Sequence, residues 1–389
     1  MRITPLQFRV LAIFVLSLSF FKGIRLPGRF ALTQYLFTYE EGFIRRGLWG
    51  SLFEPFQPHG YWELAGLAFG LLAIFILVMW RLLSQDARSG VPSALPWLAF
   101  LASPGLVFFF HIVGSLDYVA FIAVWALILA SSRIGSTATQ GICFLLSPIL
   151  LLVHEAAIVM AIPSLFFLIM TANEHSDERA IRRVAAFSVL TFATLALLVQ
   201  TGSLQASERQ SVIASVSHRA TFEVRRDAIG TLFHRTSERV ALMNKINSGK
   251  KRQKTMASSL VLFMPVTFFF FWLSLRQCRT QARARRWVTT LAIVGVGLAP
   301  LMLHFVAYDH HRWNALTNLS SFTTWLVMTR RSETDEVQPT STVYAVAALV
   351  LILSLSSTNY FFADLHPQYF PEYDHLGTLK SWGDDAAIP

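Results

Sequence analysis

Two acids, two arginines and three glycines lie within the twelve residues Tyr39–Gly50. If this segment is helical, Glu41 and Arg45 form an i,i+4 pair on one face, and Arg46 points elsewhere, free to bind a ligand. An arginine suits a phosphate because its planar guanidinium donates two hydrogen bonds at once. We therefore predict substrate binding by Arg45 and Arg46, with Glu40 beside them and Glu41 as a catalytic acid. The alternative is a salt-bridged helix at the membrane interface, anchored by its tryptophan.

His154 and Glu155 stand between two apolar runs. An ionised Glu155 in such surroundings costs several kcal/mol unless it is paired or hydrated. Burial also raises the pKa of a carboxyl group, which suits a general base. The sequence therefore predicts a catalytic pair. The alternative is a structural pair that ties two helices together where they turn.

A third group of polar residues follows an apolar run near position 305. An arginine beside an acid, here Arg312 and Asp309, is typical of contact with an anionic substrate. We assign Asp309 to catalysis, and Arg312, His311 and Trp313 to substrate binding, although Trp313 could equally be an interfacial anchor. Because His310 and His311 are adjacent, they cannot share one helical face, so no metal site is predicted.

Asp117 completes the candidates, and two roles stay open for it. It is either a catalytic acid or the N-cap of the helix that follows, since aspartate is a favoured N-cap. The chain has neither a Walker-type glycine loop nor a His-Glu-x-x-His motif, so we expect no ATP and no zinc. No cofactor is predicted, and a requirement for a divalent cation remains open.

The elements that must position these residues are membrane helices. Apolar residues make up 54% of the chain and charged residues 14%, against about 25% charged in soluble domains. The apolar runs are continuous, whereas a β-barrel would show short alternating strands. We therefore expect an all-α, polytopic helical bundle that forms one transmembrane domain over residues 1–389. The net charge of +10 is interpreted as orientation in the membrane and not as nucleic-acid binding.

About eleven transmembrane helices are expected. They are placed near 6–22, 62–81, 92–111, 117–132, 138–153, 156–172, 184–201, 257–275, 287–306, 314–328 and 341–358. Turning the chain at His154–Glu155 gathers most short-loop arginines on one side, as the positive-inside rule requires. The N-terminus is then inside and the C-terminus outside. Cys143 and Cys278 are far apart, so we expect neither a disulfide nor a thiolate metal site.

Three segments are expected outside the membrane on the far side from the cytoplasm. They are the first outer loop 22–61, the large basic loop 201–256 and the tail 359–389. Apolar residues at helical spacing in 201–256 predict short amphipathic helices on the bilayer surface. The alternative is a solvated basic loop.

With these residues in view, the chain resembles two related groups of envelope glycan enzymes: the O-antigen-polymerase-like proteins and the multi-span, polyprenyl-dependent (GT-C type) glycosyltransferases. The resemblance rests on Val153–Ala157 with Pro163 after it, on the acidic and arginine-bearing segment Glu40–Arg46, and on the loop 201–256. One departure is that the transferases usually carry an aspartate motif in the first outer loop, whereas this chain has Glu-Glu followed by Arg-Arg. The polymerases tolerate this better, because arginine–pyrophosphate contact is central there.

The resemblance implies a sugar on an undecaprenyl-type pyrophosphate carrier. Arg45, Arg46 and Arg312 then hold the pyrophosphate, and Glu155, Asp309, Glu41 or Asp117 activates the acceptor hydroxyl. The leading hypothesis is transfer or polymerisation of lipid-linked sugars at the outer face of a bacterial inner membrane. The expected partners are the lipid-linked glycan, membrane lipid and other envelope polysaccharide proteins. The alternatives are a flippase or other secondary transporter, and a non-catalytic subunit of an envelope assembly system.

Overall fold

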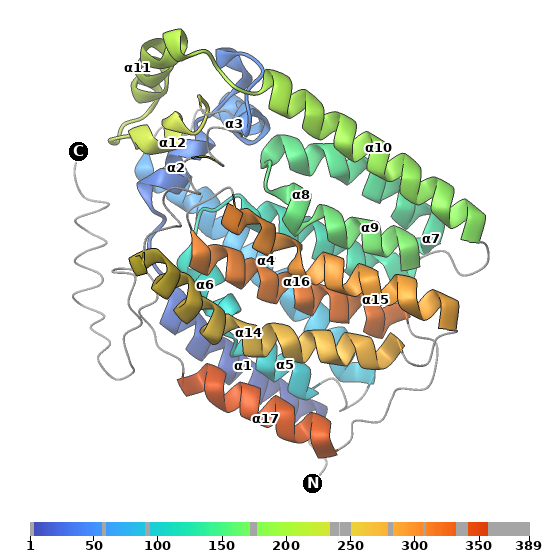
Figure 1. Ribbon diagram of the computed structural model, residues 1–389. Helices are drawn as coiled ribbons and strands as arrows, with labels where there is room; N and C mark the ends of the chain where they lie inside the picture. Colours follow the sequence, from blue (N-terminus) through green and yellow to red (C-terminus); the bar gives the residue numbers. More distant parts are fainter. Residues whose placement is uncertain are drawn as a thin grey trace.

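The computed structural model describes residues 4–56, 60–89, 94–171, 177–233, 241, 250–278, 283–305, 309–331 and 341–356. Over these residues the chain is a bundle of helices and contains no strand (Figure 1). The helices are α1 (Pro5–Gly23), α2 (Arg29–Tyr35), α3 (Gly47–Phe53), α4 (Tyr61–Ser89), α5 (Ala94–Leu101), α6 (Pro104–His111), α7 (Asp117–Val153), α8 (Ala157–Met160), α9 (Ile162–Thr171), α10 (Asp177–Thr201), α11 (Arg209–Arg219), α12 (Arg226–Gly230), α14 (Lys250–Cys278), α15 (Arg283–Leu298), α16 (His310–Arg331) and α17 (Ser341–Ser356). The expected tail 359–389 lies outside the described residues.

Six helical segments in the described part of the chain are long and apolar enough to cross a membrane. They are Pro5–Gly23, Tyr61–Asp86, Asp117–Val153, Ile181–Thr201, Gln253–Cys278 and Arg286–Phe305. Two shorter apolar helical segments, Ala157–Thr171 and Ser341–Ser354, accompany them. This all-helical arrangement is compatible with a polytopic membrane protein.

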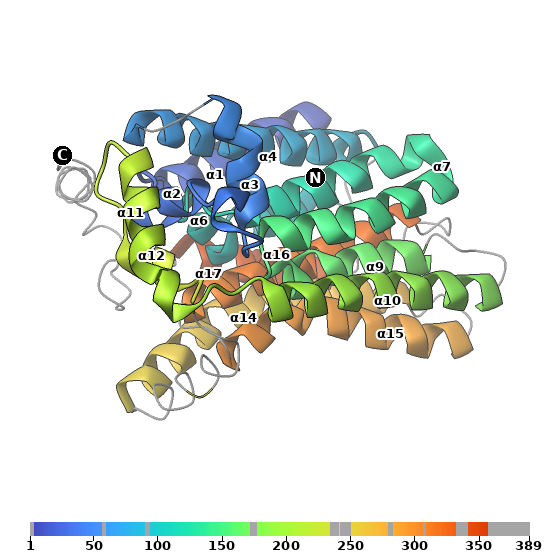
Figure 2. The same cartoon turned by 90° about the horizontal axis from the view of Figure 1, so that it is seen from above.

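Helix α7 is a hairpin and not one straight rod. A straight helix of 37 residues would be about 55 Å long. However, His154 Nε2, just beyond its last residue, lies 3.7 Å from Oδ1 of its first residue, Asp117. The chain reverses at Gly135, whose φ of 73° and ψ of 170° are not helical, and Figure 2 shows the two arms side by side. Glycine adopts a positive φ without the steric cost that a Cβ imposes.

One expected helix is interrupted. The prediction of a single helix over 92–111 is wrong, because α5 ends at Leu101 and α6 starts at Pro104. Proline disfavours helical backbone in the residue before it, and Ser103 is extended (φ −63°, ψ 146°). The Ser103 hydroxyl then accepts a hydrogen bond from the Leu106 N–H at 3.1 Å and caps α6.

Helix α16 lies in the centre of the bundle and contacts α6, α9, α14 and α15. Its Phe322 ring stacks on Phe100 with centroids 3.7 Å apart, and the indole of Trp125 donates to the Thr323 hydroxyl at 2.8 Å. The polar residues Asn314 and Asn318 on this helix are fully buried. The expected span 314–328 is therefore enclosed by protein, as helices with exposed polar groups in a membrane must be.

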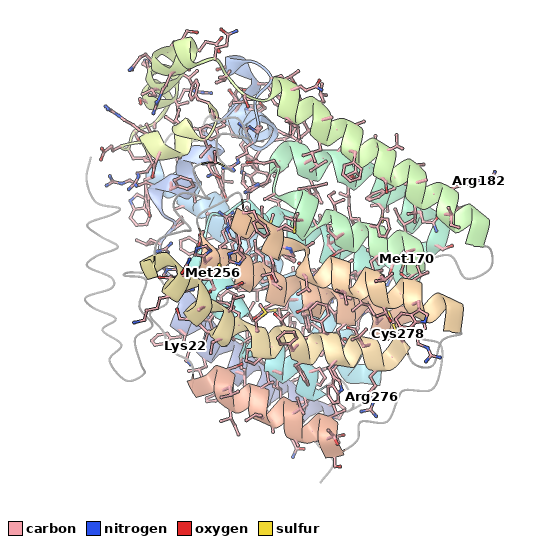
Figure 3. All side chains as sticks on the ribbon, in the orientation of Figure 1. Lys22, Met170, Arg182, Met256, Arg276 and Cys278 are labelled. Atoms are coloured by element: carbon pink, nitrogen blue, oxygen red, sulfur yellow. The ribbon has the colours of Figure 1, made fainter. Side chains whose placement is uncertain are left out.

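Four short helices, α2, α3, α11 and α12, form a cap over one end of the bundle (Figures 1 and 2). The two halves of the cap come from the expected outer loops 22–61 and 201–256. Polar contacts join them: Arg29 Nη1 lies 3.0 Å from Glu223 Oε2, and Arg219 Nη1 donates to Thr38 Oγ1 at 2.8 Å. Arginines of the expected cytoplasmic side, Arg182 and Arg276, lie toward the opposite end of the bundle (Figure 3).

Two short helices, α11 and α12, lie in the segment 201–256, where amphipathic helices were expected. Their apolar residues Val212, Val216 and Ile229 are buried, as is Leu232 just after α12. Contact of these helices with a bilayer surface stays a prediction.

Candidate functional site

The end of α7 forms a corner at His154, which is buried. His154 leaves the helix in an extended conformation (φ −157°, ψ 118°). Its Nδ1 accepts a hydrogen bond from the Ala156 N–H at 3.1 Å, and its carbonyl accepts from Ala157 N at 2.9 Å. Because Nδ1 is an acceptor, the neutral ring carries its proton on Nε2. The imidazole is thereby fixed in one tautomer and one direction.

Arg46 reaches this corner from the segment between α2 and α3. Its Nε donates to Glu155 Oε2 at 2.9 Å and its Nη2 donates to Glu155 Oε1 at 2.5 Å. This bidentate pair joins residues 109 positions apart in the sequence. Arg46 is also the one described residue other than glycine with a positive φ, at 67°. This conformation costs about 1–2 kcal/mol, so the ion pair holds a strained backbone.

The Arg46–Glu155 pair overturns two expectations. Residues 42–46 are not helical, so Glu41 and Arg45 do not share a helical face, and Arg46 is not free but paired. The expected raised pKa of Glu155 is also wrong. Burial alone would raise it, but the charges of Arg46 and His154 and the hydrogen bonds from Arg46 bring the pKa well below its usual value.

Arg312 reaches the other side of the same corner from the start of α16. Its Nε donates to Asp117 Oδ2 at 2.7 Å and its Nη2 to Ser115 Oγ at 2.9 Å. Its Nη2 also lies 3.4 Å from His154 Nε2. The Asp117 side chain is fully buried, and within the described structure its Oδ1 has no hydrogen-bond partner.

His154 links the two ion pairs into one cluster. Its Nδ1 is 3.6 Å from Glu155 Oε2 and its Nε2 is 3.7 Å from Asp117 Oδ1. Burial, followed by the nearby Arg46 charge, lowers the pKa of His154 to about 4. The ring is therefore neutral near pH 7. We call Arg46, Asp117, His154, Glu155 and Arg312 the corner cluster.

The structure separates the roles of Asp309, which was assigned to catalysis, and Asp117, for which catalysis and capping were both open. Asp309 directly precedes α16, and its Oδ1 accepts from the Arg312 N–H at 3.2 Å. This is the geometry of an N-cap, so the structure places Asp309 as the cap of α16. Asp117 makes no such capping bond, because the residue before it, Leu116, is the cap of α7 and offers no side-chain hydrogen bond.

Other predicted residues lie beside the cluster or away from it. The guanidinium of Arg45 donates to Gly202 O at 3.3 Å and to Ser203 Oγ at 2.8 Å, which fastens the loop to the end of α10. Glu40 is 61% exposed on the cap, with Oε2 3.6 Å from Arg219 Nη1. The Glu41 side chain lies outside what the structure describes.

Of the residues in α16 that were assigned to substrate binding, His311 and Trp313 are buried, and Arg312 is 17% exposed. The Trp313 ring lies under the Arg312 guanidinium, whose Cζ is 5.1 Å from the ring centroid. The His311 ring centroid is 6.4 Å from that of Phe263. His310 Nδ1 lies 2.7 Å from His304 Nδ1, so the two adjacent histidines face different partners. The residues that the structure describes contain no group of three His, Cys, Asp or Glu side chains able to hold a metal ion.

Two contributors were missed from the sequence. Ser115 holds Arg312 in place, and Ser203 holds Arg45. A single serine in a turn carries no signal of its own, because serine is common in turns for local reasons. Only its distance from an arginine far along the chain gives it a role.

Comparison of the chain with protein-family models, with curated proteins and with solved structures found no match.

Proposed function

We propose that this chain transfers or polymerises sugars carried on a polyprenyl pyrophosphate, at the outer face of a bacterial inner membrane. In this proposal it crosses the membrane eleven times, with the N-terminus inside. The extra crossings beyond the six long apolar segments come from the α7 hairpin, α5 with α6, α8 with α9, α16 and α17. The arginines opposite the cap support this orientation, since Lys and Arg gather on the cytoplasmic side. The cap and the corner cluster then lie outside.

The observation that carries the proposal is a pair of arginines, distant in sequence, that flank one acid–histidine corner. Arg46 binds Glu155 through Nε and Nη2, and Arg312 binds Asp117 through Nε and Ser115 through Nη2. No described contact uses Nη1 of either arginine, and the side chains keep 9% and 17% exposure. Each Nη1 therefore has two N–H donors for a ligand. The guanidinium groups of Arg46 and Arg312 can therefore each bind one of the two phosphates of a pyrophosphate.

The chemistry requires one proton acceptor. The acceptor-sugar hydroxyl oxygen attacks the anomeric carbon of the donor sugar, and the bond from that carbon to the phosphate oxygen breaks. The carrier pyrophosphate leaves with the bonding electrons, stabilised by Arg46 and Arg312. The hydroxyl proton passes to Glu155, which at 23% exposure is the more accessible acid of the corner cluster. Loss of one such desolvated charge contact costs about 2–4 kcal/mol, or a factor of roughly 10²–10³ in rate.

The test uses purified protein in nanodiscs and lipid-linked glycans extracted from the source cells. Product length is read on a gel for wild type, R46A and R312A. The matched control is R182A, which removes an arginine from the opposite end of the bundle. We expect loss of product in the first two variants and full product in the control. Full-length product from both R46A and R312A, with normal yields of folded protein, would refute the proposal.

A transporter is the second candidate, favoured by one observation. Glu155, His154 and Asp117 form an acid–imidazole–acid chain, which is the kind of chain that relays protons in pumps and transporters. Transporter sites lie near the membrane midplane. An E155C variant treated with a membrane-impermeant thiol reagent separates the two candidates, because this position of the corner is 23% exposed. Labelling from the outside supports the enzyme, and protection from both sides supports transport.

A further inference from the structure

The two ion pairs of the corner cluster differ in one respect that matters for a ligand. The Asp117 carboxylate is fully buried and is held by Arg312, with Ser115 on the same guanidinium. The Glu155 carboxylate is 23% exposed, and in the described part of the chain its hydrogen bonds come from Arg46. An incoming phosphate can therefore displace the Glu155 carboxylate from Arg46, whereas the fully buried Asp117 carboxylate stays on Arg312, whose Nη1 remains for the ligand.

Competition at Arg46 is set by geometry. Glu155 occupies Nε and Nη2, which form one of the two forked edges of the guanidinium. Because a phosphate also binds best through such a fork, a phosphate bound at this edge displaces the carboxylate. The charged and titratable groups that face Glu155 are Arg46 and Arg45 from the first outer loop, its neighbour His154, and Arg312 from α16.

We propose that a pyrophosphate diester takes the Arg46 fork from Glu155, so that this carboxylate becomes an effective proton acceptor only when the donor is bound. This inference rests on the proposed function, and it adds that donor binding controls when Glu155 can accept a proton. The free enzyme keeps the carboxylate occupied by Arg46. The bound enzyme releases it beside the sugar, where the acceptor hydroxyl must lose its proton.

The proposal predicts the direction in which the number of bound protons changes when the ligand binds. In the free protein the Arg46 charge keeps Glu155 ionised. Once the phosphate holds Arg46, the same carboxyl group binds a proton more readily, so ligand binding takes up protons. Ligand affinity must then increase as the pH falls, by at most about tenfold per pH unit for one proton.

The experiment measures binding of an isoprenyl pyrophosphate diester to the full chain in detergent. Its phosphates stay ionised over the titration, so any proton uptake belongs to the protein. Calorimetry of the wild type in two buffers with different ionisation enthalpies gives the number of protons taken up. We expect net uptake that grows between neutral pH and pH 5. This arm needs no variant, so it does not depend on whether a mutant folds.

Variants then assign the proton. E155Q removes the competing charge, so it should bind the diester about ten- to a hundredfold more tightly at pH 7 and lose the pH dependence. The matched control is E223Q, which alters an acid paired with Arg29 at the cap surface and should behave as wild type.

Two results separate the failure of this inference from the failure of the proposed function. Diester binding without proton uptake, and with E155Q no tighter than wild type, would overturn the displacement of Glu155 and leave the pyrophosphate site intact. Absence of diester binding in both wild type and E155Q would overturn the site itself.

Discussion

Removing Arg46 tests whether the corner cluster is held by the ion pair described here. In R46A the Glu155 carboxylate loses its bidentate partner while the side chain stays 23% exposed. Breaking a buried ion pair by removing one partner costs about 3–5 kcal/mol. The remaining exposure lowers this, so we expect R46A to reduce the free energy of unfolding by about 2–3 kcal/mol.

The positive φ of Arg46 supplies an internal check. Glycine at this position removes the charge in the same way but tolerates φ near 67°. R46G should therefore be less destabilised than R46A by about 1 kcal/mol. Because both variants lose the ion pair, the difference between their free energies of unfolding measures the backbone strain at this position.

The assay is denaturant unfolding in detergent, followed by helical circular dichroism, on wild type, R46A, E155Q and the double variant. If Arg46 and Glu155 interact as described, R46A costs less in the E155Q background, with a coupling free energy of about 1.5–3 kcal/mol. If the two single-variant changes in the free energy of unfolding add to that of the double variant within about 0.5 kcal/mol, the two side chains do not interact and the Arg46–Glu155 ion pair is refuted.

Three further outcomes are expected. The pKa of His154 is lowered to about 4, so its neutral form stabilises the fold above its unfolded pKa of about 6.5, and that stability is lost as the pH falls from 6.5 toward 4. A pH titration of the unfolding midpoint should show this component in wild type and not in H154Q; equal profiles would contradict it. A Cβ at Gly135 or at Gly141 meets nothing within 4 Å, and Gly135 is the one of the two with a positive φ (73°). G135A should thus destabilise by about 1–2 kcal/mol and G141A should be neutral or slightly stabilising, which unfolding of both measures. A Cβ at Gly105 would lie 2.6 Å from a side chain of α16, while one at Gly70 meets nothing, so G105A should cost about 1–3 kcal/mol and G70A should not; similar stability of the two would refute the close packing of α6 on α16.

Much of the helical framework was accessible from the sequence. Long charge-free runs predict helices, because the backbone groups of a segment in lipid must form their hydrogen bonds within that segment. The turn between two helices at His154–Glu155 was predicted for a different reason, because it gathers most short-loop arginines on one side of the membrane. The break before α6 was missed, although Pro104 and Ser103 carried the signal for it.

The partners of the polar residues could not be predicted from the sequence. Arg46 and Glu155 are 109 residues apart, and Arg312 and Asp117 are 195 apart. No local pattern records which acid meets which arginine. For this reason Asp309 was assigned to catalysis and the role of Asp117 stayed open between catalysis and capping. Only the position of Arg312 shows that Asp309 caps α16 and that Asp117 forms the ion pair.

The sequence by itself determined that the chain is a bundle of apolar helices and which polar residues stand at the ends of those helices. These are properties of neighbouring residues and of their spacing. The tertiary structure decided that Arg46 is paired, that Glu155 is held ionised and that Asp117 is buried. The physical reason is that the pKa and the binding capacity of a charged group depend on the charges within a few ångströms of it, and here those charges come from distant parts of the chain.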